Sequence, residues 1–432
     1  MTQINQDIIN KIISLFEHEV IPAEGCTEPI AIALAAAKAR EVLGVEPEHI
    51  NLSLSGNIIK NVKSVFVPNS GSMVGIEVAA AMGALAGDAT QDLMVLSNVT
   101  PENMTHVREF LAKNTVTYSK SDNNLKLYIK VKLIAGKKSA SVELKHTHNN
   151  ITEIIKDGET QYKASGSGTA KAEDEAEILN IRLIYELAKT IDINLLKPKL
   201  DRIINCNTAI SLEGLKNNYG VSTGKNIKQS MDRGFYGKDA RNISASNAAA
   251  ASDARMGGSA MPVMTAAGSG NVGLTASLPI IAYCRENNLS QEIMYRGLIF
   301  SILASVHIKA NIGRLSAYCG PMCASGAVAG ALIFINDGDY DKVGKAIINT
   351  LAGVSGVFCD GANSSCSIKI ANGTYAAYDG AASAMNGNVV TSGDGIVAGD
   401  VEATIRNIGE LARDGMRETD EDRKSTRLNS SH

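Results

Sequence analysis

Cysteines and turn-forming residues gather between residues 318 and 366, and the rest of the chain can be read outward from this stretch. It opens with Tyr318-Cys319-Gly320-Pro321-Met322-Cys323-Ala324-Ser325-Gly326 and closes with Gly356-Val357-Phe358-Cys359-Asp360-Gly361-Ala362-Asn363-Ser364-Ser365-Cys366. Small apolar residues between the two loops favour a helix, whereas Gly, Pro, Asn and Ser around the cysteines favour turns. Four of the seven cysteines lie here. The pattern predicts that their thiols converge.

Grouped thiols in loops are typical of a site for a soft metal or an iron–sulfur cluster. The spacings Cys-x3-Cys and Cys-x6-Cys differ from the tight Cys-x2-Cys pairs of a zinc ribbon. Three or four thiolates with one long gap suit a cluster better. The alternative is that these cysteines bind nothing and are buried as small hydrophobic residues. The spacing alone leaves both interpretations open.

The composition is that of an ordinary globular chain, long enough for two or three domains. Hydrophobic residues make up 44% and charged residues 20% of the 432 residues, and tryptophan is absent. With a net charge of −3 and dispersed histidines, no basic surface is expected for nucleic acid or for a membrane. The expected partner is therefore a small molecule.

The cysteine count bears on the compartment. An odd number of thiols favours a reducing cytoplasm rather than a disulfide framework. No N-terminal stretch has the order of a signal peptide. We also expect no run of about 18 apolar residues that could span a bilayer. The sequence therefore predicts a cytoplasmic protein.

The N-terminal region predicts two helices with a loop between them. Apolar periodicity predicts a helix from Gln6 to Glu19. The segment Glu24-Gly25-Cys26-Thr27-Glu28-Pro29 then breaks the pattern, and a second helix is expected at about residues 30–43, with Thr27 as its N-cap. Cys26 would lie just before this helix, where the helix dipole lowers the pKa of a thiol and favours the thiolate.

We expect an α+β fold in two parts. A mixed α/β region with a small sheet, residues 1–170, precedes a predominantly helical domain, residues 171–421. Strand-like alternation falls at 51–55, 64–68, 125–137 and 140–148, and Asn69-Ser70-Gly71-Ser72 reads as a polar turn. Part of the charged, glycine-punctuated stretch 220–258 is interpreted as a mobile lid or a surface insertion. Residues 422–432 lose all periodicity and are expected to be a non-native or disordered tail.

The segment Gly268-Ser269-Gly270-Asn271-Val272-Gly273 matches the dinucleotide fingerprint G-x-G-x-x-G. Its helical surroundings argue against a dinucleotide, which needs a βαβ unit. We favour a turn whose backbone N–H groups, at a helix N-terminus, hold a substrate carboxylate. The structural alternative is a tight turn that lets helices pack closely. A pyridoxal phosphate would also suit such a turn, but its candidate lysines, Lys309 and Lys145, have ordinary surroundings in the sequence.

Two histidines end a predicted strand on one face, where they suit a metal or an anion. They are His146 and His148, and no third ligand lies near them in the sequence. An ordinary polar role is the alternative, and substrate binding by His146 is a hypothesis. Cys206, in a short turn, and Cys284, in a helix, are expected to be structural.

With these motifs the chain resembles the L-cysteine desulfidase family, whose members are similar to the alpha subunit of serine dehydratase. The resemblance covers about residues 5–420. It rests on residues 24–29, Pro68-Asn69-Ser70-Gly71, Gly268-Ser269-Gly270-Asn271, and Cys359-Asp360 with Cys366. The family is similar to iron–sulfur L-serine dehydratases, in which three cysteines hold a [4Fe–4S] cluster and one iron stays open to substrate. The polar tail after Asp420 and the length of the 220–258 stretch depart from the family pattern.

Residue roles follow from the resemblance by position. It implies Cys319, Cys359 and Cys366 as the cluster ligands, although Cys323 lies so near Cys319 that the first ligand stays ambiguous. It implies Cys26 as a non-ligand cysteine whose thiolate acts as the base. Substrate contacts are expected from residues of the quoted motifs, namely Thr27, Glu28, Asn69, Ser70, Gly270 and Asn271, and from His146 at the end of the predicted strand.

The implied reaction is a pyridoxal-independent α,β-elimination that converts L-cysteine to pyruvate, ammonia and sulfide, with L-serine as the alternative substrate. A homo-oligomer, specifically a dimer, is expected. Two alternatives belong to other classes: a non-catalytic iron–sulfur or thiol sensor, and a structural helical protein with inert cysteines. A pyridoxal phosphate enzyme is the rival within catalysis.

Overall fold

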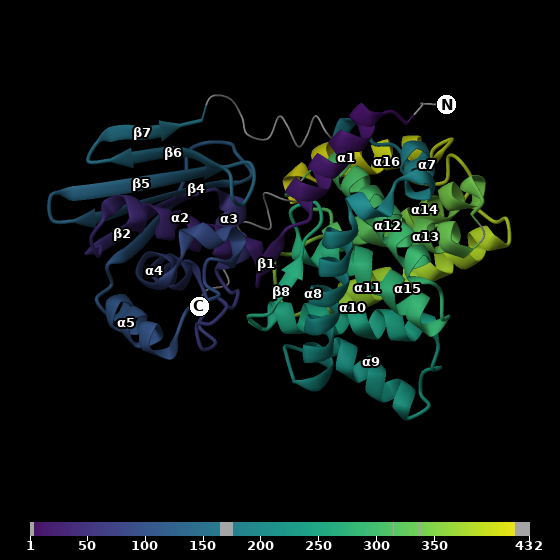
Figure 1. Ribbon diagram of the computed structural model, residues 1–432, viewed down its shortest axis with the longest axis horizontal. Helices are drawn as coiled ribbons and strands as arrows, with labels where there is room; N and C mark the ends of the chain where they lie inside the picture. Colours follow the sequence, from purple (N-terminus) through teal and green to yellow (C-terminus); the bar gives the residue numbers. More distant parts are fainter. Residues whose placement is uncertain (1–3, 165–175, 314, 337, 420–432) are drawn as a thin grey trace.

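The computed structural model describes residues 4–164, 176–313, 315–336 and 338–419. A smaller part built on a sheet lies beside a larger helical part (Figure 1). The α+β class predicted from the sequence is confirmed. The tail predicted at 422–432 lies outside the described residues.

The sheet part is a twisted layer covered by helices. Its strands lie side by side in the order β3 (Val116–Lys120), β2 (His49–Leu54), β4 (Tyr128–Ala135), β5 (Lys138–Lys145), β6 (Ile151–Lys156) and β7 (Glu159–Lys163). The β2–β3 pair is parallel and every other pair is antiparallel. Alternate residues of β4 are buried, as expected for a sheet with one face against a core.

Small residues let the covering helices pack tightly on this sheet. Helix α2 (Thr27–Leu43) contacts β4 and β5, α4 (Ile76–Ala86) packs on α2, and α5 (Pro101–Ala112) packs on α4. A Cβ atom added at Gly83 of α4 would lie 2.2 Å from the carbonyl oxygen of Ala33 in α2, so this contact depends on glycine. A short helix, α3 (Gly56–Val62), and a 3₁₀ segment, η1 (Ala89–Met94), complete the sheet part.

The helical part is built around apolar helices buried along most of their length. Its elements are α7 (Ile181–Thr190), η2 (Ile193–Leu195), α8 (Lys197–Lys216), α9 (Thr223–Asp232), α10 (Ala240–Met256), α11 (Gly270–Glu286), α12 (Gln291–Ile312), α13 (Gly320–Asn336), α14 (Tyr340–Val354), α15 (Cys366–Met385), α16 (Val401–Glu410) and the π-helical turn η3 (Leu411–Gly415). Helix α1 (Gln6–Glu19) also belongs here, because Ile12, Leu15 and Phe16 are buried in the helical core.

A two-stranded antiparallel ribbon joins the two parts. Strand β1 (Pro22–Glu24) pairs with β8 (Pro262–Met264), which leads into the turn before α11. The segment that enters α2 is therefore anchored on the helical part. This ribbon positions the motif around Cys26 next to the glycine-rich turn.

Several local predictions can be compared with the structure. Helix Gln6–Glu19 is confirmed residue for residue. The N-cap of α2 is Cys26 rather than Thr27. The strand predicted at 64–68 is wrong, since Phe66 makes only an isolated bridge with Val74. Cys206 lies inside α8, not in a turn.

Residues 220–258 divide into a peripheral and a buried portion, so a lid or surface insertion can include only part of this stretch. Most of α10 is buried between α8, α11 and α15. Its alanine-rich sequence packs closely against these neighbours, while the charged residues that favoured a lid lie mainly in α9 and in the turn after it. Only α9 lies at the periphery (Figure 1).

Helix α12 corrects the expectation that no apolar run could span a bilayer. By length and composition it passes that test, but 83% of its most apolar window is buried inside the protein. It packs against α7, α11, α13 and α16. A helix that is apolar on all sides fits the centre of a large helical core equally well.

Candidate active site

A cavity of about 120 Å³ lies where the two parts of the molecule meet. The sheet part contributes the first turn of α2, helix α3 and the end of β5. The helical part contributes the end of α10, the end of α12 and the turns before α11, α13 and α15. Its lining includes four cysteines from three separate segments: Cys26, Cys319, and Cys359 with Cys366 on one loop. Only the fold brings these thiols together.

Main-chain pairing brings Cys319 and Cys359 to the same side of the cavity wall. The N–H of Cys319 donates to the carbonyl oxygen of Val357 at 3.2 Å, and the N–H of Cys359 donates to that of Ala317 at 2.6 Å. These bonds flank an antiparallel bridge between Tyr318 and Phe358. In such a bridge, the two cysteines are diagonal neighbours on one face.

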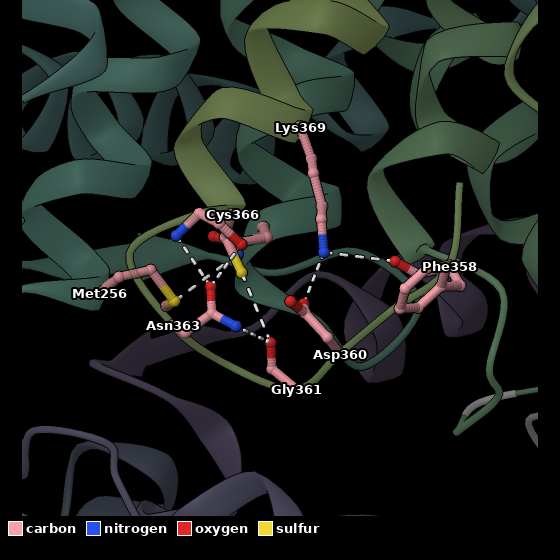
Figure 2. A network of polar contacts seen from close by, with 9 residues as sticks. Met256, Phe358, Asp360, Gly361, Asn363, Cys366 and Lys369 are labelled. Carbon is pink, nitrogen blue, oxygen red and sulfur yellow. Dashed lines mark hydrogen bonds and ion pairs between the residues drawn. The ribbon is translucent and has the colours of Figure 1, made fainter. Parts of the chain in front are cut away.

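The loop from Cys359 to Cys366 is shaped by its own polar contacts (Figure 2). The side-chain oxygen of Asn363 accepts hydrogen bonds from the N–H of Ser365 at 2.8 Å and from its hydroxyl at 2.6 Å. The N–H of Cys366 donates to the carbonyl oxygen of Asn363. Gly361 has a φ of 95°, and its carbonyl oxygen lies 3.8 Å from Cys366 Sγ. The turn therefore brings Cys366, the first residue of α15, back toward Cys359.

The thiols of this group influence one another's charge. Burial raises the pKa of Cys319 well above its usual value, and the neighbouring Cys359 and Cys366 raise it further. Burial also raises the pKa of Cys366, and Cys359 adds to that effect. Three thiolates would repel each other at this depth. Without a compensating positive charge, Cys319 and Cys366 are neutral thiols.

The ambiguity between Cys319 and Cys323 concerns which thiol faces the cavity. Cys319 lines it, whereas Cys323 does not and is completely buried in the helical core. The Cys323 thiol approaches the carbonyl oxygen of Cys319 at 3.9 Å, and burial raises its pKa to about 11. Cys323 behaves as a packed thiol one turn into α13.

Cys26 occupies the predicted place but not the predicted charge state. It is the N-cap of α2, is 1% exposed, and its Sγ lies 3.8 Å from the sulfur of Met256. Burial raises its pKa to about 12, although Arg255 lowers it. The expected thiolate is therefore wrong for the ligand-free protein, because lost hydration outweighs the helix dipole.

Several cavity residues were missed by the sequence analysis. Arg255, at the end of α10, is 4% exposed, and Lys60 in α3 is also buried. No motif marked these cations, because each lies in an ordinary helical pattern.

Unpaired polar atoms line the same cavity. The buried atoms Asn57 Oδ1, Asn61 Oδ1, Arg255 Nε and Tyr318 Oη have no hydrogen-bond partner within the described part of the chain. Buried polar groups are nearly always paired. A cavity lined by such atoms is therefore prepared for a polar ligand.

Helix N-termini converge on the cavity as well. Residues of the first turns of α2, α11 and α15, and Cys319 with Gly320 at the start of α13, belong to its lining. The N-caps of α2 and α15 form no side-chain capping bond, so first-turn N–H groups are left for other partners. Several positive helix ends around one cavity favour an anion.

The structure brings some of the predicted substrate residues to the cavity and not others. Thr27, Glu28, His146 and Asn271 line it. Glu28 accepts a hydrogen bond from Asn61 at 2.9 Å. Gly270 lies behind the lining, where an added Cβ would come within 2.4 Å of Arg255 Nε. Gly270 therefore makes room for Arg255.

Asn69 and Ser70 lie away from the cavity and border a neighbouring hollow. Asn69 donates to the carbonyl oxygen of Leu96 at 2.9 Å, while Glu24 accepts from the Leu96 N–H at 2.6 Å. Pro68 packs against Gly25, whose φ is 52° and where an added Cβ would lie 2.3 Å from the proline ring. In this conformation, the segment braces the turn that carries Cys26.

No group of three or more His, Cys, Asp or Glu side chains within the described ranges could hold a metal ion as placed. A larger hollow of about 620 Å³ adjoins the cavity and shares Lys309 and Ala267 with it. None of the residues predicted to bind the cluster or the substrate lines this larger hollow.

Comparison with known proteins identifies the family. The sequence profile described as "Serine dehydratase alpha chain" matches residues 90–422. The chain belongs to this family. A UPF0597 protein of Fusobacterium nucleatum is 50% identical over 416 residues, which cover 96% of this chain and 97% of the relative. UPF0597 proteins of Treponema denticola and Lachnoclostridium phytofermentans are each 41% identical to this chain. Each alignment covers 95% of this chain, and the two cover 96% and 97% of the respective relatives.

Membership of the serine dehydratase alpha-chain family indicates a lyase of the serine dehydratase type. Iron–sulfur dependence is general in that family. The profile match includes β5 and the elements of the helical part that line the cavity, whereas α2 with Cys26 and α3 lie before it. The glycine-rich turn follows a three-residue strand of an antiparallel ribbon, which does not match the βαβ unit of a dinucleotide site.

Proposed function

We propose that the protein catalyses a pyridoxal-independent α,β-elimination on a small L-amino acid, with L-cysteine as substrate and a [4Fe–4S] cluster as cofactor. The observation that carries the proposal is the meeting of Cys26, Cys319, Cys359 and Cys366 around one cavity that also holds buried cations. A sensor needs a cluster but no prepared polar pocket. The unpaired polar atoms of the lining therefore favour an enzyme.

The cavity offers cysteine thiols, which are the usual ligands of an iron–sulfur cluster. The thiolates of a [4Fe–4S] cluster bind different irons and need not converge on a single ion position. Three protein thiolates leave one iron open, and such an iron, when the cluster is bound, would act as a Lewis acid toward the leaving group. Cys319, Cys359 and Cys366 would hold it, because the positive charge of the iron offsets the repulsion among three thiolates.

The residues of the protein would bind the amino acid by its charged ends. Arg255 and the first-turn N–H groups of α11 offer donors to the carboxylate. Glu28 and the side-chain oxygens of Asn57 and Asn61 offer acceptors to the ammonium group. Both ends of a zwitterion then find partners, and the α-carbon is held between α2 and α11.

Cys26 Sγ is proposed to take the α-proton. The electron pair of the broken C–H bond forms the Cα–Cβ double bond, and the Cβ–S bond breaks with loss of sulfide. The aminoacrylate tautomerises to an imine, which water hydrolyses to pyruvate and ammonia. Arg255 already lowers the pKa of Cys26, and the ammonium group of a bound substrate would lower it further.

L-Serine is the second candidate substrate, and the family match favours it. The two amino acids differ only in the leaving atom. Soft iron accepts a thiolate leaving group more readily than a hydroxide, which favours L-cysteine.

The test is anaerobic purification followed by measurement of iron and acid-labile sulfide per chain. Pyruvate is assayed with L-cysteine and with L-serine in the same sample. We expect about four irons per chain, as a [4Fe–4S] cluster requires, and faster pyruvate release from L-cysteine. Iron without turnover on either amino acid would favour the sensor. Protein without iron would contradict the cofactor, and turnover abolished by borohydride would favour pyridoxal phosphate.

Substitution of Arg255 by methionine tests carboxylate binding. We expect an increase in KM for the amino acid of about 10- to 100-fold, because a charged hydrogen bond contributes about 1.5–3 kcal/mol. The iron content should not change. R241M is the matched control, since Arg241 lies on the same helix and pairs with Asp379 at the surface. An unchanged KM in R255M would remove Arg255 from substrate binding.

A further inference from the structure

Lys369 joins the two ends of the loop that carries Cys359 and Cys366. It lies in the first turn of α15, three residues after Cys366. Its Nζ lies 2.5 Å from Asp360 Oδ1 and donates to the carbonyl oxygen of Phe358 at 3.3 Å. Asp360 follows Cys359 directly, so the side chain spans from one predicted ligand to the other. Figure 2 shows Lys369 above the loop with both contacts.

The contact is more than an ordinary surface ion pair. The Lys369 and Asp360 side chains are 20% and 41% exposed, and the additional bond to Phe358 anchors the lysine on the strand segment before Cys359. Exposed pairs contribute little to stability. A half-buried lysine held by a carboxylate and a carbonyl has a defined position.

The position of Lys369 also gives it an electrostatic role. Its Nζ contacts the two residues that flank Cys359, and Lys369 lies one turn after Cys366 in α15. One cation therefore lies beside both predicted ligands of the loop. Groups that contact or face metal ligands tune the affinity and the redox potential of the metal.

We propose that Lys369 and Asp360 form a clamp that holds the Cys359–Cys366 loop in its ligand geometry, and that the Lys369 ammonium offsets the negative charge of the cluster thiolates. This inference rests on the proposed cofactor. It concerns two positioning residues and assigns neither of them a contact with the substrate.

The experiment compares the anaerobically purified wild-type holoenzyme with K369M, K369R and D360N. Iron release to an excess of chelator and the reduction midpoint potential of the cluster are measured. K369M is expected to release iron about 10-fold faster or more, in line with other residues that support metal ligands. Its midpoint potential should shift to more negative values, because a nearby positive charge favours the reduced cluster. D360N should also release iron faster, but its potential should shift in the opposite direction.

The variants separate the clamp from a general effect on stability. K369R keeps the charge and should keep the wild-type midpoint potential. K345M is the matched control, since Lys345 pairs with Asp341 at 2.6 Å on the surface of α14, and it should match the wild type in both measurements. Equal iron release and equal potential in K369M and wild type would overturn the clamp while leaving the cluster in place. Iron-free wild-type protein would overturn both the cofactor and the clamp.

Discussion

Substitution of Cys359 by serine is expected to remove the iron, the visible absorbance of the cluster and the turnover of L-cysteine together. Cys359 is bonded through its backbone to Ala317 and lies on the same face of the bridge as Cys319. A serine hydroxyl keeps nearly the same volume but is a poor ligand for iron at neutral pH, because soft metals prefer thiolates. Iron per chain, absorbance and pyruvate release are measured on one anaerobic sample.

Two control variants show whether this loss is specific. Cys206→Ser alters a partly buried thiol of α8 that does not line the cavity. Cys323→Ala removes the thiol that packs inside α13. Both should keep iron and turnover, whereas Cys319→Ser and Cys366→Ser should behave like Cys359→Ser. Cluster and activity retained in Cys359→Ser would rule out the ligand assignment.

Substitution of Cys26 by alanine is expected to lower kcat by about 10²- to 10⁴-fold while iron content stays at the wild-type value, since general base catalysis contributes about that factor. Cys26 packs near Cys366. We nevertheless assign Cys26 the role of general base and not that of an iron ligand. Measuring iron on the same sample as kcat separates the two roles. Loss of iron in C26A would instead make Cys26 a ligand.

The pH profile adds a second readout. A thiol with a pKa raised to about 12 accepts a proton only after deprotonation, so kcat/KM should rise with pH as Cys26 titrates. This rising limb should be absent from the residual activity of C26A. Cys284→Ala is the control, because Cys284 is buried in α11 with a pKa raised to about 11 but lies outside the cavity. Wild-type activity in C26A would exclude Cys26 as the base.

The sequence by itself was sufficient for features encoded locally. The apolar periodicity of residues 6–19 predicted α1 to the residue. Turn-forming residues around Cys319, Cys359 and Cys366 predicted loops at helix starts, and the same three cysteines line one cavity. Such signals work because turn geometry and helix periodicity depend on neighbours within one or two turns.

Local patterns failed where burial decides the outcome. The charged residues of the 220–258 stretch suggested that part of it lies at the surface, which holds for α9, but they did not reveal that α10 is a core helix packed against α8, α11 and α15. Cys26 has the sequence position of an activated thiol, and desolvation raises its pKa instead. Burial depends on which distant segments pack around a residue.

What the sequence determined, then, is the α+β class, the helix starts that carry the cysteines, and the residue types available for chemistry. Only the tertiary structure placed Cys319 rather than Cys323 at the cavity and brought Arg255, Asn57 and Tyr318 to its wall. It also placed Asn69 and Ser70 outside the cavity, in the segment that supports the turn carrying Cys26. The physical reason is that a binding site is made by contacts between residues far apart in the chain, and no periodicity or spacing encodes those contacts.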